Sequence, residues 1–550
     1  MASGAKPSGI DMKYYLTTPL YYVNSKPHIG HAYTQIAADT LARYKRMQLG
    51  TENVHFLTGT DEHGQKIDKA AREAGMPPQE FTDKISLTFR DLWKVLNISQ
   101  DDFIRTTEDR HKEAVRRVWE KMKDATVDVA GKQEKVLYRH TYDGTYCVPC
   151  ETFITEGLLD PNHPSLCPDC KRPLEKMKED TYFFRMSAYQ SRLIDDIRQG
   201  RLKILPETRR NEVLGFLEHQ TLTDLSVSRP KNRLAWGIPI PFDPEHVTYV
   251  WLDALVNYIS ACGYEKNDTL FKKWWPADVH IIGKDIIRHH AVIWPTLLYA
   301  LDIELPKMIF AHGWWVQSGQ KMSKSLGNVT DPNEIVRVYG VDAFRYFLLR
   351  ETPFGQDGTF NEEALILRCN ADLANGLGNL LSRTLTMCEK YFEGQIPIID
   401  LNERLSEKDQ SSGFVWSGFA SLCARISILP KEIHESMDIL SFDETLKRIW
   451  LVVERANQFI EETAPWKLAK AEKKDELKYV IGVLGEALRA ISQAIWPFMP
   501  EKSQAIWNQL GLTGLPCEAP FNENSWGYFK SGGKIAKGQS LFPRIDIKNQ

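Results

Sequence analysis

Two short segments, far apart in the chain, carry side chains that could bind phosphate together. Pro27–His31 (PHIGH) places two imidazoles around a glycine, after an extended run and just before a predicted helix over residues 34–47. Lys321–Ser325 (KMSKS) places two ammonium groups in a basic loop flanked by glycines. Helix N-termini attract anions because their unpaired N–H groups and their dipole favour negative charge. Taken singly, each segment is also compatible with solvated surface side chains, so the prediction depends on the fold that joins them.

Short apolar runs alternate with amphipathic helical stretches at the start of the chain and again before the KMSKS segment. Residues 14–17 and 54–58 have the pattern of buried strands on either side of a helix, which predicts a βαβ unit with parallel strands. Residues 247–251, 280–283 and 307–312 are predicted as further strands. Ligands in such folds bind beyond the carboxyl ends of the strands, so the loops after the first two strands should face one crevice.

Four of the nine cysteines form two C-x-x-C pairs that are separated by sixteen residues. Each pair presents two thiolates from a tight turn, and this spacing is typical of one tetrahedral zinc ion. Thiolates fill all four positions, so we expect the zinc to be structural rather than catalytic. The alternative, four free thiols, would leave the intervening hairpin without a core. The predicted metal ligands are Cys147, Cys150, Cys167 and Cys170.

The composition is that of a globular protein with several domains. The 550 residues exceed what one hydrophobic core usually organises, and they are 43% hydrophobic and 26% charged. A formal net charge of −3 argues against a protein that coats nucleic acid non-specifically. No apolar run is long enough to cross a membrane, and the polar N-terminus lacks the apolar stretch of a secretory signal. We therefore expect a cytoplasmic protein without a membrane partner.

The order of these patterns predicts an α/β fold with a Rossmann-type parallel sheet, followed by helices. An interruption that contains the clustered cysteines breaks the strand–helix alternation, and helical periodicity dominates the last third of the chain. The predicted segments are the first half of the sheet domain (12–124), a zinc-containing insertion (125–225), the second half of the sheet domain (226–317), the KMSKS loop region (318–370), an all-α bundle (371–525) and a tail that packs back on the body (526–550).

Together these features resemble the class I aminoacyl-tRNA synthetases, and within that class the methionyl-tRNA synthetases with a single zinc knuckle. The resemblance covers essentially the whole chain. It is carried by the PHIGH and KMSKS segments, the split α/β order, the C-terminal helices and five further segments: Pro19–Tyr22, Thr60–Gly64, Tyr249–Ala254, Gly283–Asp285 and Ala464–Trp466. It implies that the sheet domain is catalytic, that residues 318–370 include a stem-contact region and that the bundle binds the anticodon.

The resemblance implies a two-step reaction. Methionine attacks the α-phosphate of ATP, bound with Mg²⁺, to give methionyl-adenylate and diphosphate. The methionyl group then moves to the 3′ end of tRNA(Met), and AMP is released. The implied catalytic residues, which stabilise charge on the phosphates, are His28, His31, Lys321 and Lys324. The implied ATP-binding residues are His28, Gly30, His31, Gly283, Lys284, Asp285, Lys321, Met322, Ser323, Lys324 and Ser325.

The resemblance also implies sites for methionine and for the anticodon. Asp61 is expected to hold the methionine ammonium group, and Trp466 to stack on an unpaired base. The alternatives are plain core packing for the apolar pocket residues and capping of the bundle for Trp466. The implied methionine-binding residues are Leu20, Tyr22, Asp61, Trp251, Ala254, Leu255, Tyr258, Ile287 and His290. The implied anticodon-binding residues are Asn379, Arg383, Pro465 and Trp466.

Two positions depart from the family's pattern and leave the lid of the methionine pocket undecided. Leu225 stands where some members carry tryptophan, and His289 where phenylalanine is common. The chain lacks room for the appended domain through which some relatives dimerise, so we expect a monomer.

Two other functions compete with this prediction. The first is a class I synthetase for valine, isoleucine, leucine or cysteine, although the insertion is short for an editing domain and the zinc has no open position. The second is a non-catalytic tRNA-binding protein on a synthetase scaffold, although the phosphate-binding histidines and lysines are all present.

Overall fold

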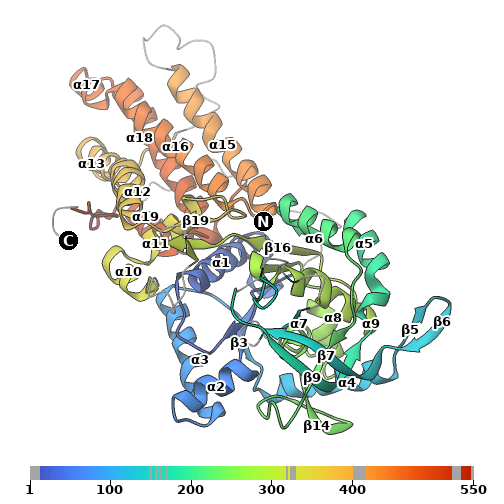
Figure 1. The fold of residues 1–550 in the computed structure, drawn as a ribbon. Coiled ribbons are helices and arrows are strands. Elements are labelled where there is room, and N and C mark those ends of the chain that lie inside the picture. The colour runs from blue at the N-terminus through green and yellow to red at the C-terminus, as the bar shows by residue number, and fades with distance from the viewer. Residues whose placement is uncertain are drawn as a thin grey trace. The chain divides into compact units, whose positions relative to one another are not determined.

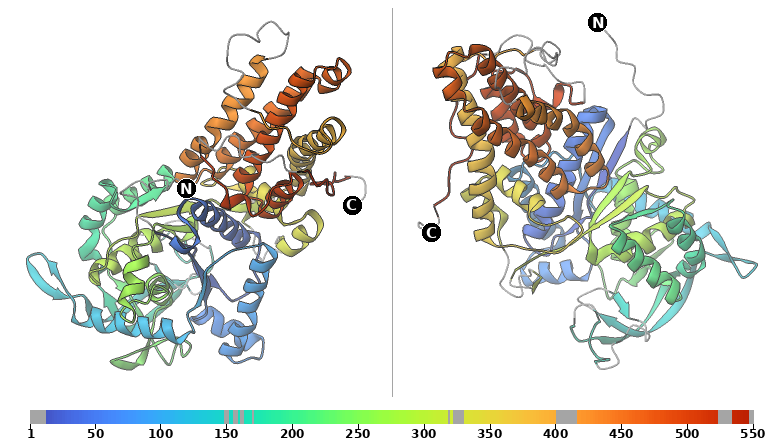
Figure 2. Two further views of the ribbon diagram at one scale, coloured as in Figure 1. Left: turned by 180° about the vertical axis from the view of Figure 1, so that it is seen from behind. Right: turned by 90° about the horizontal axis from the view of Figure 1, so that it is seen from above.

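The structure is a computed structural model that describes residues 13–147, 152–154, 159, 163–168, 171–317, 320–321, 330–399, 416–522 and 534–546. The chain divides into two units, each described by itself. Unit 1 draws on Met1–Pro27, Glu52–Lys94 and Ser99–His312. Unit 2 draws on His28–Thr51, Val95–Ile98 and Gly313–Gln550. Figures 1 and 2 show the course of the chain in three views.

A seven-stranded parallel sheet forms the centre of unit 1. The strand order is β10-β16-β15-β1-β3, and β2 and β4 both pair with β3. The strands are β1 (Tyr14–Thr17), β2 (Tyr21–Tyr22), β3 (Val54–Asp61), β4 (Asp102–Arg105), β10 (Lys203–Leu205), β15 (Val279–Gly283) and β16 (Met308–His312). The predicted α/β class and the predicted parallel pairing of β1 with β3 are thus confirmed.

Helices surround this sheet, and most of them share one large hydrophobic core with it. They are α2 (Gln65–Glu73), α3 (Pro78–Val95), α4 (Asp109–Asp124), α5 (Gln190–Arg198), α6 (Glu207–His219), α7 (Val250–Ser260), α8 (Asp268–Trp274) and α9 (Trp294–Ala300). Strands β3 and β16 are almost wholly buried. Continuous burial is the pattern of parallel strands that are covered on both faces.

The strand predicted over residues 247–251 is wrong in part. Strand β14 (Asp243–Thr248) ends before Tyr249, and α7 begins at Val250. Strand β14 also pairs antiparallel with β12 (Ser228–Pro230) and β13 (Pro239–Ile240) in a separate small sheet. A short apolar run does not by itself distinguish a buried strand from a buried helix.

The segment predicted as an insertion contains mostly antiparallel strands. Its main sheet has the order β11-β9-β7-β8, and β5 and β6 form a projecting hairpin (Figure 1). The strands are β5 (Thr126–Val129), β6 (Lys132–Lys135), β7 (Leu137–Cys147), β8 (Thr152–Ile154), β9 (Glu175–Phe184) and β11 (Leu225–Ser226). Strand β10, from the same range, joins the central parallel sheet beside β16, which the sequence did not predict.

Unit 2 is predominantly helical. Its helices are α1 (Ile29–Leu49), α10 (Pro332–Tyr339), α11 (Val341–Arg350), α12 (Glu362–Arg368), α13 (Asn379–Phe392), α15 (Trp416–Asp438), α16 (Phe442–Thr463), α17 (Pro465–Lys470), α18 (Lys474–Ile495) and α19 (Pro500–Gln509). Helices α15, α16 and α18 pack side by side in all views (Figures 1 and 2). A small sheet joins β17 (Trp315–Gln317), β18 (Gln320–Lys321) and β19 (Gly358–Thr359). None of the helices described in either unit is long and apolar enough to span a membrane.

Helix α1 belongs to unit 2 although it follows β1 in the sequence. Arg345 of α11 is fully buried and binds Asp39 of α1 through Nη2 at 2.7 Å. The same guanidinium donates to three backbone carbonyl groups, those of Leu96, Pro497 and Phe498. All three nitrogens of this buried cation thus donate to an acceptor, so the pair fixes α1 within the helical unit.

The tail also lies against unit 2. The N–H of Ile535 donates to the carbonyl of Gly394, and the N–H of Ala536 donates to that of Gln509. Leu541 and Phe542 are buried.

Candidate active site

The two histidines of the PHIGH segment form the N-terminal cap of α1. The helix begins at Ile29, so the predicted start near residue 34 is wrong by more than one turn. The Nδ1 atom of His28 accepts from the N–H of Gly30, and Nδ1 of His31 accepts from the N–H of His28, both at 3.0 Å. The ring centroids lie 3.9 Å apart. Both imidazoles are therefore held by their own backbone at the end of a helix.

This cap decides which nitrogen of each imidazole carries the proton. Because Nδ1 accepts a hydrogen bond in both rings, the proton of the neutral form sits on Nε2. Each ring therefore presents an N–H donor, as a phosphate oxygen requires. Gly30 is needed for the close cap, since a Cβ there would lie 2.9 Å from Cε1 of His28.

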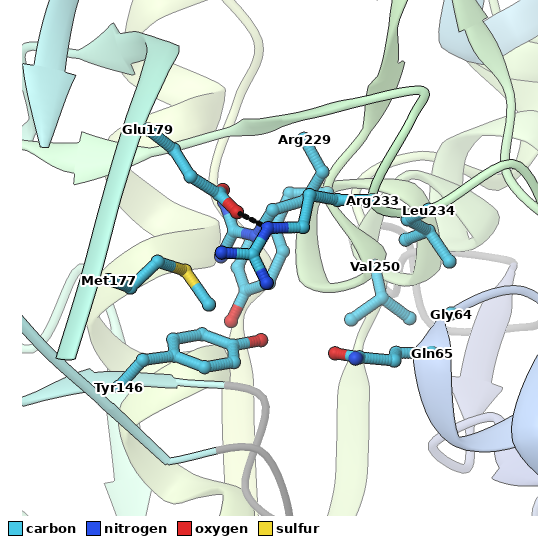
Figure 3. Close-up of a pocket in the computed structure, with 10 residues that line it drawn as sticks. Gly64, Gln65, Tyr146, Met177, Glu179, Arg229, Arg233, Leu234 and Val250 are labelled. Carbon is cyan, nitrogen blue, oxygen red and sulfur yellow. Dashed lines mark ion pairs between the residues drawn. The ribbon is translucent and has the colours of Figure 1, made fainter. Parts of the chain in front are cut away.

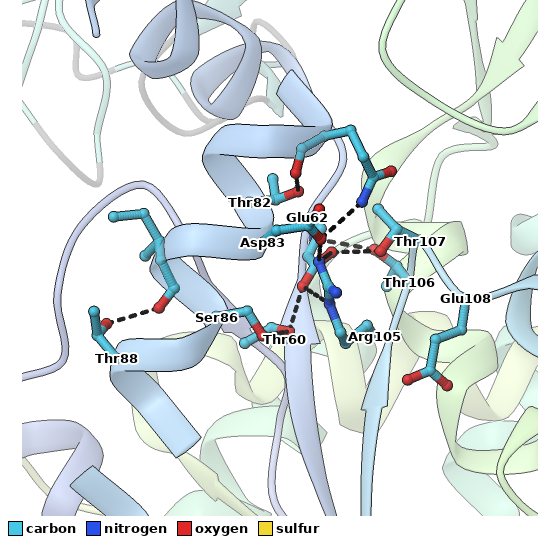
Figure 4. Close-up of polar contacts among 12 residues, drawn as sticks. Thr60, Glu62, Thr82, Asp83, Ser86, Thr88, Arg105, Thr106, Thr107 and Glu108 are labelled. Carbon is cyan, nitrogen blue, oxygen red and sulfur yellow. Dashed lines mark hydrogen bonds and ion pairs between the residues drawn. The ribbon is translucent and has the colours of Figure 1, made fainter. Parts of the chain in front are cut away.

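In unit 1, the loop after β3 is fixed by a buried carboxylate (Figure 4). Glu62 is fully buried and receives two bonds from Arg105 of β4, at 2.7 and 2.8 Å. The hydroxyls of Thr60 and Thr107 donate to the same carboxylate, and Trp236 donates to the Glu62 carbonyl at 2.5 Å. A bidentate guanidinium–carboxylate pair fixes the orientation of the two side chains as well as their distance. The segment that follows Asp61 is therefore rigidly placed at the carboxyl end of β3.

The predicted methionine-binding residues of unit 1 come from β2, β3, α7 and the segment after β15. Tyr22 of β2 pairs in register with Asp61, and its ring meets Trp251 edge-on at 6.1 Å. Trp251, Ala254, Leu255 and Tyr258 fall at positions i, i+3, i+4 and i+7 of α7, which places them on one helical face. Leu255, Tyr258 and Ile287 belong to the main core, and Leu20 packs against it.

Tyr258 and His290, two members of this group, are hydrogen-bonded to each other. The Tyr258 hydroxyl lies 2.7 Å from Nε2 of His290, and Nδ1 of His290 lies 3.0 Å from the Ile286 carbonyl. Because a carbonyl only accepts, Nδ1 carries the proton and Nε2 accepts from the tyrosine. Burial lowers the pKa of His290 to about 4, so the ring is neutral near pH 7.

The two departures from the family pattern have different surroundings. The imidazole of His289 stacks on the indole of Trp251 at 3.8 Å, and burial lowers its pKa to about 3. His289 begins a π-helical turn, His289–Ile293, a geometry that is frequent at functional sites. Leu225 lies in β11, pairs with Phe184 and packs against the core. His289 is thus the aromatic stacking partner of Trp251.

Asp253 lies on the opposite side of α7 from the methionine face and is fully buried. His63 Nδ1 and His111 Nε2 each lie 2.7 Å from one of its carboxylate oxygens. Burial alone would raise the pKa of Asp253, but the two histidines lower it to about 2. The carboxylate is thus ionised at neutral pH.

We expect Asp253 to make the stability of the protein depend on pH in acid. Its pKa falls from about 3.9 in the unfolded chain to about 2, which corresponds to about 2.5 kcal/mol. This contribution is present above about pH 4 and is lost as the pH falls towards 2. Urea unfolding between about pH 5 and 2 should show a shallower loss of stability for Asp253→Asn than for the wild type. Parallel curves for the two proteins would contradict the assignment.

The remaining predicted nucleotide-binding residues are described only in part. Gly283 ends β15, and a Cβ there would lie 2.6 Å from Oδ1 of Asp285, so the backbone turns tightly before Lys284. The backbone of Lys321 ends β18, which pairs with Val316 of β17. Met322, Ser323, Lys324 and Ser325 lie outside the described residues.

The predicted anticodon-binding residues lie in unit 2. Asn379 is exposed at the start of α13, and Arg383, one turn later, pairs with Glu461 of α16 at 2.7 Å. Pro465 is buried at the first position of α17, whereas Trp466 is 45% exposed. The indole is thus open to a stacking partner.

Two of the four predicted zinc ligands are described, and both are buried. Cys147 ends β7, and Cys167 forms a turn in which its N–H donates to the Arg172 carbonyl. The two cysteines form one small cluster against which Leu159 and Leu174 pack. Cys150 and Cys170 lie outside the described residues, and within the described part of the chain no group of three potential ligands occurs.

A small cavity lies between the insertion strands and the elements that carry the methionine-site residues (Figure 3). An ion pair of 2.9 Å joins Glu179 of β9 to Arg233, whose guanidinium points toward Tyr146 in Figure 3. The lining is Gly64, Gln65, Tyr146, Met177, Glu179, Arg229, Arg233, Leu234, Tyr249 and Val250. None of the predicted site residues that the structure describes lines this cavity.

Comparison with known proteins identifies relatives along the whole chain. The family model described as "tRNA synthetases class I (M)" matches residues 14–385. A methionine–tRNA ligase of Caldanaerobacter subterraneus subsp. tengcongensis is 48% identical, over 98% of this chain and 80% of the relative. That of Thermotoga maritima is 44% identical, over 98% and 81%. The structure of Mycobacterium tuberculosis methionyl-tRNA synthetase with methionyl-adenylate is similar with a TM-score of 0.86, at 39% identity, over 97% of this chain and all of that one.

Proposed function

This chain belongs to the methionine–tRNA ligase family of the class I tRNA synthetases, and we propose that its sequence-predicted site residues carry out the reaction of that family. The reaction is the ATP-dependent activation of methionine to methionyl-adenylate, followed by transfer to the 3′ end of tRNA(Met) with release of AMP and diphosphate. The observation that supports this assignment is that Tyr22 pairs in register with Asp61 at the end of β3 and meets Trp251 edge-on, and that Tyr258 lies on the same face of α7 as Trp251.

Methionine is bound by a buried carboxylate and an aromatic wall. Asp61, 2% exposed at the end of β3, pairs with the ammonium group of the substrate. Aromatic rings contact the thioether, because sulfur packs favourably against the edge of an aromatic ring. The wall is formed by Leu20, Tyr22, Trp251, Ala254, Leu255, Tyr258, Ile287 and His290, and it is extended by His289. Neutral His290 gives the wall no net charge that would repel or trap an ion.

The ATP phosphates are held by donors from the end of α1 and from the KMSKS segment. His28 and His31 donate from Nε2, where the helix N-terminus adds favourable potential. Lys321 and Lys324 neutralise charge as diphosphate departs, Gly283 leaves room at the strand end, and Mg²⁺ accompanies ATP as part of the substrate. No side chain acts as a covalent nucleophile, because the methionine carboxylate attacks in the first step and the tRNA hydroxyl in the second.

The test of this function is the charging of tRNA. With ATP, methionine and a tRNA(Met) transcript, the protein should form methionyl-tRNA. Oxidation of the tRNA 3′ terminal diol with periodate should abolish the product, since it removes the accepting hydroxyl groups. Charging of tRNA(Met) with valine, isoleucine, leucine or cysteine instead would support the competing synthetase, and no charging with any amino acid would support the non-catalytic protein.

We expect Trp466→Ala to weaken tRNA charging while leaving amino-acid activation intact. The exposed indole of α17 offers a stacking surface for an anticodon base, and Asn379 and Arg383 of α13 complete the proposed site. Loss of a stacked base costs about 1–3 kcal/mol, or roughly a 5- to 150-fold rise in the KM for tRNA. The measurement compares charging with methionine-dependent pyrophosphate exchange. Leu367→Ala, another exposed apolar residue of unit 2, is the matched control, and equal loss of both activities in Trp466→Ala would indicate a folding role.

We expect the purified protein to contain one structural zinc ion per chain. Cys147 and Cys167 are buried in one cluster, which suits two of four thiolate ligands, and Cys150 and Cys170 would complete the set. The ion would join the two turns of the insertion and supply no catalytic step. Metal analysis of the double variant Cys147→Ser/Cys167→Ser should show no zinc and a lower melting temperature, whereas Cys262→Ser, a buried single cysteine, should retain the metal. Zinc-free wild-type protein with an unchanged melting temperature would refute the site.

The protein is further proposed to act as a monomer in the cytoplasm. Light scattering should give a mass near 63.2 kDa that does not change with concentration. A mass of twice that value would refute the monomer.

A further inference from the structure

A buried chain of polar groups runs behind the methionine face of α7. His111 of α4 is fully buried, and its Nδ1 lies 2.9 Å from the Ser260 hydroxyl. Its Nε2 lies 2.7 Å from Oδ1 of Asp253, whose Oδ2 lies 2.7 Å from Nδ1 of His63. The Ser260 hydroxyl donates to the Asn257 carbonyl at 3.1 Å. One carboxylate thus joins α4, α7 and the loop after β3.

The hydrogen bonds determine where the protons are. A carboxylate only accepts, so His63 carries a proton on Nδ1 and His111 carries one on Nε2. The Ser260 hydroxyl lies within hydrogen-bond distance of both Nδ1 of His111 and the Asn257 carbonyl, so both ring nitrogens of His111 have a buried partner. Asp253 accepts from both histidines. A charge-assisted pair of this kind, inside a dry core, is held more tightly than a neutral one.

This chain of hydrogen bonds fixes the rotation of α7 about its own axis. Asp253 follows Trp251 by two residues, so the two side chains leave the helix about 200° apart. Asp253, Asn257 and Ser260 form the face toward α4, and Trp251, Leu255 and Tyr258 form the methionine face. A turn of α7 that broke the contacts of Asp253 would displace the whole methionine face.

The Asp253 carboxylate also fixes the segment that follows Asp61. His63 follows Asp61 by two residues, and its Nδ1–H is bound to Asp253. Its ring also lies 5.3 Å from the indole of Trp236, which donates to the Glu62 carbonyl. The Asp253 carboxylate therefore anchors both proposed parts of the methionine site: the segment next to Asp61, which binds the ammonium group, and the aromatic wall, which contacts the thioether.

We propose that His111, Asp253 and His63 are positioning residues for methionine: their hydrogen-bonded chain holds the segment that follows Asp61 and the thioether-binding helix α7 at the spacing that the substrate requires. This inference rests on the methionine site proposed above. Displacement of a positioned group by about 1 Å costs about 10²-fold in rate. The hydrogen bonds given for His63, His111 and Asp253 join none of the described ATP-binding or tRNA-binding residues proposed above, so loss of these bonds should act on methionine selectively.

The test separates the KM for methionine from the KM for ATP in pyrophosphate exchange. His111→Leu removes both ring nitrogens and should raise the methionine KM by about 10- to 100-fold, with a change of less than about threefold in the ATP KM. His111→Gln keeps an N–H donor at the position of Nε2, so it should recover most of the methionine KM. His63→Asn keeps a donor at the position of Nδ1 and should be closer to wild type than His63→Leu.

A second buried histidine serves as the matched control for folding. His246 of β14 is 4% exposed, forms an ion pair with Asp243 at 3.0 Å and lies 3.1 Å from the Asp180 carbonyl. His246→Leu should lower the melting temperature as His111→Leu does, while leaving the methionine KM unchanged. Equal rises of both KM values in His111→Leu, or failure of His111→Gln to recover, would overturn the proposal.

A single-turnover experiment excludes a chemical role. Enzyme-bound methionyl-adenylate, isolated and mixed with tRNA, should transfer its methionyl group at the wild-type rate in His63→Asn and in His111→Gln. A transfer step that is slow while activation is normal would show that His63 acts as a base and would overturn the positioning role. Asp61→Asn separates this failure from failure of the methionine site. If that variant raises the methionine KM and His111→Leu does not, only the present inference is refuted.

Discussion

Replacement of Asp61 by asparagine is expected to lower kcat/KM for methionine in pyrophosphate exchange by about 10²- to 10³-fold. Asp61 is 2% exposed, so the substrate ammonium would enter a buried site without its counter-charge. Loss of one partner of a buried ion pair costs about 3–5 kcal/mol, and each 1.4 kcal/mol is tenfold. The KM for ATP should change far less, because the phosphate-binding residues are left intact.

Asp83→Asn is the matched control for Asp61→Asn. Asp83 is half exposed, belongs to the Arg105 network of Figure 4 and has no proposed contact with the substrate. An exposed pair of this kind contributes only about 0–1 kcal/mol, so the variant should stay close to wild type in both activity and stability. A methionine KM for Asp61→Asn equal to that of Asp83→Asn would remove Asp61 from the site.

Replacement of Arg345 by leucine is expected to lower the free energy of unfolding of the protein by about 3–5 kcal/mol. The fully buried guanidinium holds Asp39 and three carbonyl groups, which the variant would leave without that donor. Arg43 also binds Asp39 at 2.8 Å, so the carboxylate keeps one cationic partner and the cost should fall near the lower value. Urea unfolding, followed by circular dichroism, gives the measurement.

Two comparisons test the explanation for Arg345. The double variant Asp39→Leu/Arg345→Leu removes the carboxylate together with the guanidinium. The double variant should therefore be more stable than Arg345→Leu alone. Arg337→Leu removes an arginine whose side chain is 71% exposed and pairs with Glu334, and should be nearly neutral. Equal unfolding free energies for Arg345→Leu and Arg337→Leu would contradict the structural role.

The strands of the sheet could be predicted from sequence because burial on both faces leaves a continuous apolar run. Residues 14–17 and 307–312 correspond closely to β1 and β16 for this reason. The start of α1 could not be predicted in the same way. Histidine is not among the usual N-cap residues, and the cap at His28 depends on a reciprocal bond with His31 that only the coordinates reveal. The prediction therefore left both histidines outside the helix, whereas His28 is its N-cap and His31 lies in its first turn.

Contacts within the site were less predictable than its members. The residues around the thioether share α7 at helical spacing, which follows from the sequence once the helix is known. His111 carries no local signal, since it is one histidine on an amphipathic helix. Its partner Asp253 lies 142 residues away. Likewise, β10 is only three residues long, and its place beside β16 depends on a pairing of distant segments.

The most direct test of the account is methionine-dependent exchange of labelled pyrophosphate into ATP by the wild-type protein without tRNA. We expect exchange with methionine, and none above background with valine, isoleucine, leucine or cysteine, because the proposed site combines the Asp61 carboxylate for the ammonium group with an aromatic wall for the thioether. Exchange driven by one of those four amino acids, or no exchange with methionine, would contradict the account.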